Sequence, residues 1–289
     1  MSFTDRIKYE YTKGNSAIRQ IIMINLGVFV ISLLINLFGQ LMQVNPANFF
    51  SYFYLPSDLG TLVLRPWTFL TNIFFHSMSS MWHILGNMIM LYFIGRILQD
   101  FLDRSKVWTI FLGGGLVGGL FFVVMANVFP LFSDVVSRMV LLGASGGVTA
   151  IIVATGVHLP YYEVRPFGVF RIQMRWLAAI LVLLDLLNMP ASANFGGLFA
   201  HLGGALFGAL YILNLQGRIN IPSFELPSFK RSKMKTVYRD EGKRQVRANL
   251  RKSKPDQQQI DAILDKISQS GYDSLSQEEK EILFKASDS

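Results

Sequence analysis

Hydrophobic residues form long continuous runs separated by short polar segments, and this pattern is typical of a helical membrane protein. A helix needs about 20 mostly apolar residues to cross a hydrocarbon layer roughly 30 Å thick. We therefore predict an all-α integral membrane fold, a bundle of six transmembrane helices, in which Gly and Pro interrupt the fourth and fifth runs. The six runs lie near residues 20–43, 82–102, 107–129, 142–159, 175–190 and 195–215.

Composition and charge agree with this prediction. Hydrophobic residues make up 51% of the 289 residues and charged residues only 16%, which is unusually apolar for a soluble domain. Of the 27 Lys and Arg residues, 25 lie in the N-terminal arm, in the 96–106 and 160–175 connections, or after residue 216. Because positive residues concentrate on the cytoplasmic side, we expect both termini to be cytoplasmic. The N-terminus lacks the features of a removable signal segment, so we expect the first run to be retained.

The same pattern divides the chain into four regions. We predict a cytoplasmic arm over 1–19, the membrane domain over 20–215, a basic linker over 216–254 and a small helical tail over 255–289. The linker favours contact with anionic lipid at the membrane surface. We do not expect nucleic acid as a partner, because the positive-inside rule already explains where the charge lies.

The tail shows the pattern of a helical hairpin. Apolar residues from Ile260 to Ile267 follow helical spacing, and Gly271 is a plausible end for that helix. Ser276 and Glu279 then form a capping box before a second apolar stretch. The hairpin is too small to bury much alone, so we expect it to dock on the bundle, a second copy or a partner.

The connection over 44–81 is unusually aromatic for a loop. Aromatic rings suit the headgroup level of a bilayer. We therefore predict a membrane-lying first loop that is packed and partly helical. The alternative is a small folded cap outside the membrane. The aromatic residues are Phe49, Phe50, Tyr52, Phe53, Tyr54, Trp67, Phe69, Phe74 and Phe75.

Polar residues within the apolar runs are the candidates for chemistry, because a polar group at membrane depth is costly. Ser145 lies among the small residues Gly143, Ala144 and Gly146, which allow a tight backbone turn and the close approach of another chain. This setting suits a serine nucleophile. The alternative is that the small residues only permit close helix packing.

His201 precedes a stripe of small residues on one helix face, formed by Ala200, Gly204 and Gly208. Such a stripe favours very close contact with a neighbouring helix. If that neighbour is the fourth run, the imidazole could remove the proton of the Ser145 hydroxyl. The alternative is a structural histidine that is hydrogen-bonded to a backbone carbonyl.

His83 and Asn87 are four residues apart and share one face of the second helix. Both carry N–H groups that could stabilise a developing oxyanion. The alternative is a structural interhelical hydrogen bond. From the expected orientation, these two residues, Ser145 and His201 lie at a similar depth near the outer surface, as a single water-accessible site requires.

As a set, these residues resemble the rhomboid intramembrane proteases. The resemblance covers roughly residues 60–212 and rests on the Gly-Ala-Ser-Gly motif at 143–146, on Ala200-His201 followed by Gly204 and Gly208, and on His83 with Asn87. It implies a serine endopeptidase in which Ser145 is the nucleophile and His201 the general base and acid. The implied oxyanion donors are His83, Asn87 and the Ser145 amide. It also implies membrane-anchored protein substrates cut near the outer face of the bilayer, and location in a bacterial inner membrane.

Two other functions are compatible with these residues. One is a catalytically inactive rhomboid-like protein that binds or escorts membrane proteins, and the other is a transporter with a polar path. We expect no metal or cofactor, because the histidines lack the paired spacing of a helix metalloprotease. The sequence indicates no oligomeric state.

Overall fold

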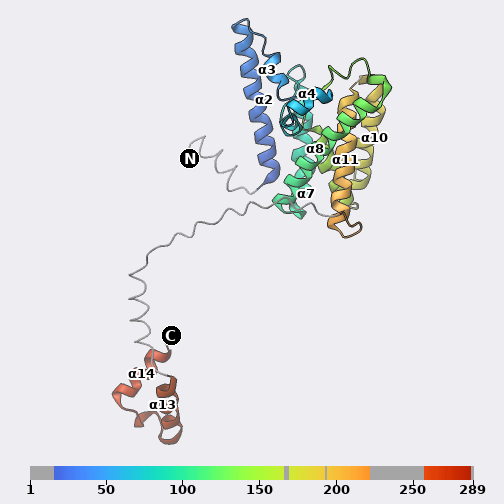
Figure 1. The fold of residues 1–289 in the computed structure, drawn as a ribbon. Helices are drawn as coiled ribbons and strands as arrows, with labels where there is room; N and C mark the ends of the chain where they lie inside the picture. Colours follow the sequence, from blue (N-terminus) through green and yellow to red (C-terminus); the bar gives the residue numbers. More distant parts are fainter. Residues whose placement is uncertain (1–15, 166–168, 193, 222–256, 288–289) are drawn as a thin grey trace. The chain divides into compact units, whose positions relative to one another are not determined.

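The computed structural model describes residues 16–165, 169–192, 194–221 and 257–287 (Figure 1). Most of the predicted arm and basic linker lie outside the described residues, including the proposed contact with anionic lipid. The chain divides into two compact units, Met1–Ser223 and Phe224–Ser289.

Each of the six predicted spans contains a helix. The second is interrupted by one π-helical turn, η2, and therefore consists of α6, η2 and α7. These elements all belong to the first unit. In chain order they are α2 Ala17–Leu41, α6 Met81–Met90, η2 Leu91–Gly95, α7 Arg96–Phe101, α8 Arg104–Val128, α9 Ser145–His158, α10 Met174–Ser192 and α11 Phe195–Leu215.

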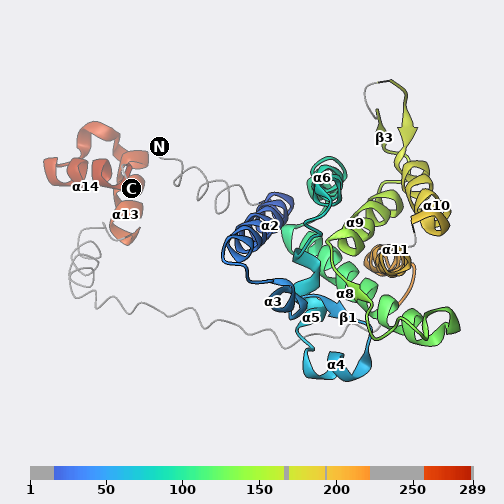
Figure 2. The ribbon, with the colours of Figure 1, turned by 90° about the horizontal axis from the view of Figure 1, so that it is seen from above.

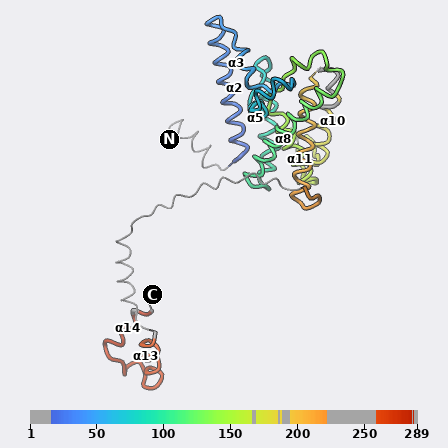
Figure 3. Tube along the Cα trace, viewed as in Figure 1, coloured from blue at the N-terminus to red at the C-terminus, as the bar shows by residue number. Residues whose placement is uncertain are grey.

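The fold is a mainly helical membrane bundle, in agreement with the predicted all-α class, but helix length alone supports fewer than six crossings. In the described residues, α2, the segment Met81–Phe101, α8 and α11 are long and apolar enough to span a membrane. The apolar segments Ser145–His158 and Met174–Leu184 are shorter, so the count of six stays a prediction. The start of α2 and the end of α11 lie at the same end of the bundle (Figure 3), which agrees with an even number of crossings.

Helix α9 is shorter than the fourth run predicts. It begins at Ser145, three residues after the expected start, and its 14 residues extend about 21 Å at 1.5 Å per residue. The backbone before it is not helical because Gly143 has a φ of +132°, a conformation that other residues rarely adopt. Ser145 therefore lies at the start of a helix rather than within it.

The core of the bundle is built by close backbone contacts of α9 with α8 and α11 (Figure 2). A Cβ atom on Gly204 would collide with the Gly146 carbonyl, and one on Gly208 would collide with the Ala150 carbonyl. On the α8 side, a Cβ on Gly114 would overlap the Ala150 side chain. Glycine is therefore required at these positions by close packing, as the predicted small-residue stripe of α11 indicated.

The first loop is packed and partly helical, as predicted, while its position relative to a membrane stays a prediction. Its Phe53 and Phe75 rings stack with centroids 4.9 Å apart, and the Trp67 Nε1–H donates to the Tyr52 carbonyl at 2.8 Å. Its elements are α3 Ala47–Ser51, β1 Leu55–Pro56, α4 Leu59–Leu64, α5 Thr68–Thr71 and the 3₁₀ turn η1 Asn72–Phe74.

Two short antiparallel strand pairs fix connections of the bundle. Strand β1 pairs with β2, Val140–Leu141, so that Leu55 lies opposite Leu141. This pairing joins the first loop to the segment that leads into α9. Strands β3, Glu163–Val164, and β4, Ile172–Gln173, form a hairpin between α9 and α10.

The second unit contains the predicted helical hairpin, formed by α13 Gln257–Ser270 and α14 Gln277–Ser287. Gly271 follows α13 with a φ of +77°. The predicted capping box is present, since the Ser276 N–H donates to Glu279 Oε2 at 2.8 Å and the Glu279 N–H donates to Ser276 Oγ at 3.3 Å. Lys266 Nζ forms an ion pair with Glu279 at 2.9 Å.

The substitution Gly204→Ala should destabilise the bundle by about 1–3 kcal/mol, because the added Cβ meets backbone atoms that cannot rotate away. Gly27→Ala in α2 is the matched control, since a Cβ there has no atom within 4 Å. The control should be neutral or slightly stabilising. Thermal unfolding in detergent would measure both, and equal melting temperatures would contradict the close contact.

Candidate active site

One cavity of about 460 Å³ collects all four of the polar residues for which the sequence predicts chemistry. It lies between the start of α6, the start of α9, the start of α11 and the segment around β2. Its walls are both polar and apolar. The lining residues are Ser77, Trp82, His83, Gly86, Asn87, Val140, Leu141, Leu142, Ser145, Asn194, Gly197 and His201.

Ser145 reaches this cavity because the backbone turns sharply before it. The Gly143 N–H donates to the Asn72 carbonyl at 2.9 Å, which ties the turn to the end of the first loop. Ala144 is fully buried, and its carbonyl accepts the first hydrogen bond of α9, from the Val148 N–H at 2.9 Å. The Ser145 side chain is therefore presented at the partly positive N-terminus of a helix.

His201 lies next to a close contact between α11 and α9. A Cβ atom on Gly146 would be 3.2 Å from the Ala200 carbonyl oxygen. Ala200 directly precedes His201, and Gly146 directly follows Ser145. The close contact at this level thus brings the histidine and the serine to the same cavity.

His83 and Asn87 enter the cavity from α6. The His83 ring packs on Gly143, where a Cβ would be 3.0 Å from His83 Nε2 and 3.6 Å from Ser145 Oγ. A small group in that position would contact both side chains. Asn87 is buried, and its Nδ2 donates to the His83 carbonyl at 2.8 Å. The side-chain nitrogen of Asn87 carries two hydrogens, and the bond to the His83 carbonyl uses only one of them.

Comparison with known families finds one match in each unit. The model of the Rhomboid domain matches residues 64–218, more than half of the chain. The chain belongs to the rhomboid family. Rhomboid proteins are generally intramembrane serine proteases that act on membrane proteins, although inactive members exist. Residues 247–289 match a family of unknown function (DUF6576), and no curated protein matches the chain.

The rhomboid domain also places a second histidine, His76, beside His83, and sequence reasoning assigned no role to His76. The His76 ring is 2% exposed, and its centroid is 5.3 Å from that of His83. Neither His76 ring nitrogen has a hydrogen-bond partner in the described part of the chain. Burial, and secondarily the neighbouring His83, lower the His76 pKa to about 4, against a weaker opposing attraction from the Phe74 backbone.

Asn194 and Trp82 are cavity residues that sequence reasoning missed. Asn194 caps α11, and its Oδ1 accepts a hydrogen bond from the Gly197 N–H at 3.1 Å. An asparagine before an apolar run is a signal for such a cap. The Trp82 side chain lines the cavity yet is 79% exposed, which follows from its position at the first turn of α6.

We expect the stability of the protein to decrease as the pH falls from about 6.5 towards 4. His76 is neutral in the folded protein, whereas in the unfolded chain it protonates with its ordinary pKa of 6.5. Between these two pKa values the unfolded chain binds more protons, so the free energy of unfolding decreases as the pH falls. The variant His76→Gln should show a weaker decrease, because it lacks that titration. Thermal melts of both proteins across this range would test the effect. A stability difference between them that is the same at both ends of the range would contradict it.

Proposed function

We propose that this protein is an intramembrane serine endopeptidase that uses Ser145 as nucleophile and His201 as general base and acid. One observation carries the proposal: the four candidate polar residues, which come from three different helices, line one cavity. A purely structural role for each residue would not require that they meet.

The proposed reaction begins with attack of Ser145 Oγ on the carbonyl carbon of a peptide bond. His201 accepts the hydroxyl proton and then gives it to the amine that leaves, so that an acyl-enzyme remains. A water molecule then attacks the acyl-enzyme with His201 again as the base. This step releases the carboxylate product and restores the serine.

The oxyanion of the tetrahedral intermediate needs donors at the position where negative charge develops. We assign this role to the Ser145 N–H, the His83 ring N–H and the side-chain amide of Asn87. The position of Ser145 at the start of α9 supports this role, because the N-terminus of a helix favours negative charge.

The substrates in this proposal are membrane-anchored proteins, which agrees with the general activity of the rhomboid family. A peptide bond must be extended to reach Ser145, so a substrate helix has to unwind locally near the site of cleavage. The distribution of Lys and Arg supports cytoplasmic termini, and hence cleavage near the outer face of the bilayer. A bacterial inner membrane remains our expectation from the family resemblance.

Ser145→Ala and His201→Ala should each reduce cleavage of a single-span model substrate by more than about 10⁴-fold. Ser133→Ala and His158→Gln are matched controls, because neither residue lines the cavity, and both should cleave like the unaltered protein. Cleavage by purified protein in liposomes is the measurement. Equal cleavage by all five proteins would exclude the dyad, and no cleavage of a substrate panel by the unaltered protein would favour an inactive rhomboid.

Asn87→Ala and His83→Ala should lower kcat by about 100-fold each while leaving the fold intact, as expected for the loss of one oxyanion donor. Gly86→Ala offers a control within the same cavity, since a Cβ there has no atom within 4 Å. Steady-state kinetics would separate kcat from KM. A rise in KM with unchanged kcat would assign these residues to substrate binding instead.

A further inference from the structure

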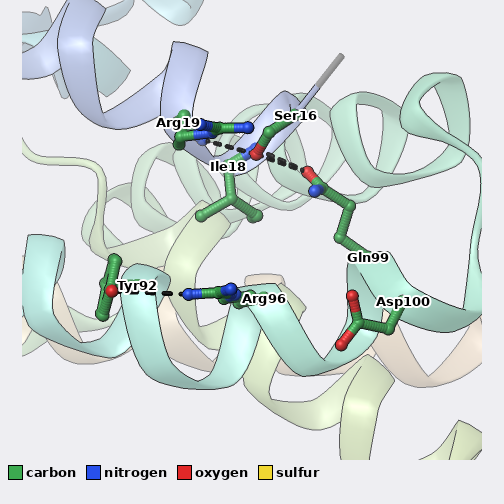
Figure 4. A pocket seen from close by; sticks show the side chains of 7 residues that line it. All are labelled: Ser16, Ile18, Arg19, Tyr92, Arg96, Gln99 and Asp100. Carbon is green, nitrogen blue, oxygen red and sulfur yellow. Dashed lines mark hydrogen bonds between the residues drawn. The ribbon is translucent and has the colours of Figure 1, made fainter. Parts of the chain in front are cut away.

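A second cavity, of about 390 Å³, lies between the start of α2 and the helix formed by η2 and α7 (Figure 4). It shares no residue with the active-site cavity. Most of its lining side chains are polar or charged: Ser16, Ile18, Arg19, Tyr92, Arg96, Gln99 and Asp100.

Hydrogen bonds hold the walls of this cavity together. Gln99 Oε1 accepts from the Ser16 hydroxyl at 3.1 Å and from the Ile18 N–H at 3.0 Å. Ser16 Oγ in turn accepts from the Arg19 N–H at 3.1 Å. Gly95 in η2 allows Ile18 to pack closely, since a Cβ on Gly95 would lie 2.5 Å from Ile18 Cδ1. The start of α2 is thus fixed against η2 and α7.

The charged side chains of the cavity come from both walls. Arg19 belongs to α2, whereas Arg96 and Asp100 belong to α7. Arg96 and Asp100 are four residues apart, a spacing at which opposite charges often pair on a helix. Within the described residues, however, neither of them forms an ion pair, and Arg96 Nη1 instead donates to the Tyr92 hydroxyl at 3.5 Å. Figure 4 shows the two side chains extending separately along the cavity.

Exposed apolar side chains continue from these charges along both helices. On α2, Leu26 and Val30 follow Arg19 by seven and eleven residues, and they are 43% and 52% exposed. On the other wall, Tyr92 precedes Arg96 by four residues and is 48% exposed, and Leu85 lies further along the same segment, in α6, and is 45% exposed. In a membrane helix, such side chains face lipid. The cavity therefore lies where a polar headgroup would meet two acyl chains.

We propose that this cavity binds the headgroup of one phospholipid that carries a primary amine. The phosphate lies between Arg19 and Arg96, because guanidinium groups bind phosphate oxygens through paired hydrogen bonds. The ammonium group of the lipid donates a hydrogen bond to the Asp100 carboxylate and lies opposite this negative charge. The acyl chains follow the exposed side chains of α2 and α6, which a soluble phosphate compound would leave uncovered.

Native mass spectrometry of the full chain, purified in detergent and mixed with phosphatidylethanolamine and phosphatidylcholine of identical acyl chains, tests this site. The unaltered protein should retain the ethanolamine lipid at least about fivefold more, which corresponds to one hydrogen bond that only the primary amine can donate. A trimethylated amine has no N–H to donate to Asp100. Equal retention of the two lipids would overturn the assignment without any substitution.

Variants test the individual groups. The double variant Arg19→Gln with Arg96→Gln should retain at least about tenfold less ethanolamine lipid, and Asp100→Ala, which has no acceptor oxygen in its side chain, should bind both lipids equally. Arg138→Gln is the matched control, because Arg138 is exposed and its side chain bonds only to the Asp134 carbonyl of its own turn among the described contacts. Retention by the double variant equal to that of this control would overturn the proposal.

Excess inorganic phosphate separates the two sources of a phosphate group. The lipid should remain bound in its presence, because its acyl chains contribute to affinity. If phosphate alone displaces the lipid from the unaltered protein but has no effect on the double variant, the cavity is a site for a soluble anion. That outcome would overturn the lipid assignment.

Discussion

Backbone contact between α9 and its neighbours is the constraint on which the rest of the structure depends. Gly204 and Gly208 bring α11 against the carbonyls of α9, and Gly114 brings α8 against the Ala150 side chain. Without side chains at these points, a helix of only 14 residues is enclosed by longer helices. Its first residue, Ser145, therefore lies within the bundle, next to the level at which Ala200 contacts Gly146.

The parts of this arrangement that repeat along one helix could be predicted from the sequence. Spacing alone placed Gly204 with Gly208 and His83 with Asn87 on shared faces, because a helix has a fixed period. The start of α9 could not be predicted from hydrophobicity. It is set by the conformation of Gly143 and by its hydrogen bond to the Asn72 carbonyl, 71 residues earlier in the chain. The position of His76 beside His83 is likewise a tertiary contact without local periodicity.

The first loop supports the cavity through hydrogen bonds that could not be predicted from the sequence. Strand β1 pairs with β2 directly before the Gly143 turn, and the Ser57 hydroxyl donates to the Met139 carbonyl at 3.1 Å. The Asn127 amide of α8 also donates to the Ser57 carbonyl at 2.8 Å. The aromatic loop, α8 and the segment before α9 are thus one connected support. The aromatic composition predicted that the loop is packed, but strand pairs of two residues are too short to be recognised in a sequence.

The π-helical turn η2 explains how one continuous segment serves two cavities. A π turn inserts an additional residue, which rotates all following side chains relative to those before it. His83 and Asn87, before the turn, line the cavity beside Ser145, whereas Arg96 and Asp100, after it, line the cavity beside the start of α2. Gly95 ends the turn where Ile18 packs against it. The two cavities are therefore separate in space but carried by one helix, so the contact of α2 with η2 also fixes the helix that holds His83 and Asn87.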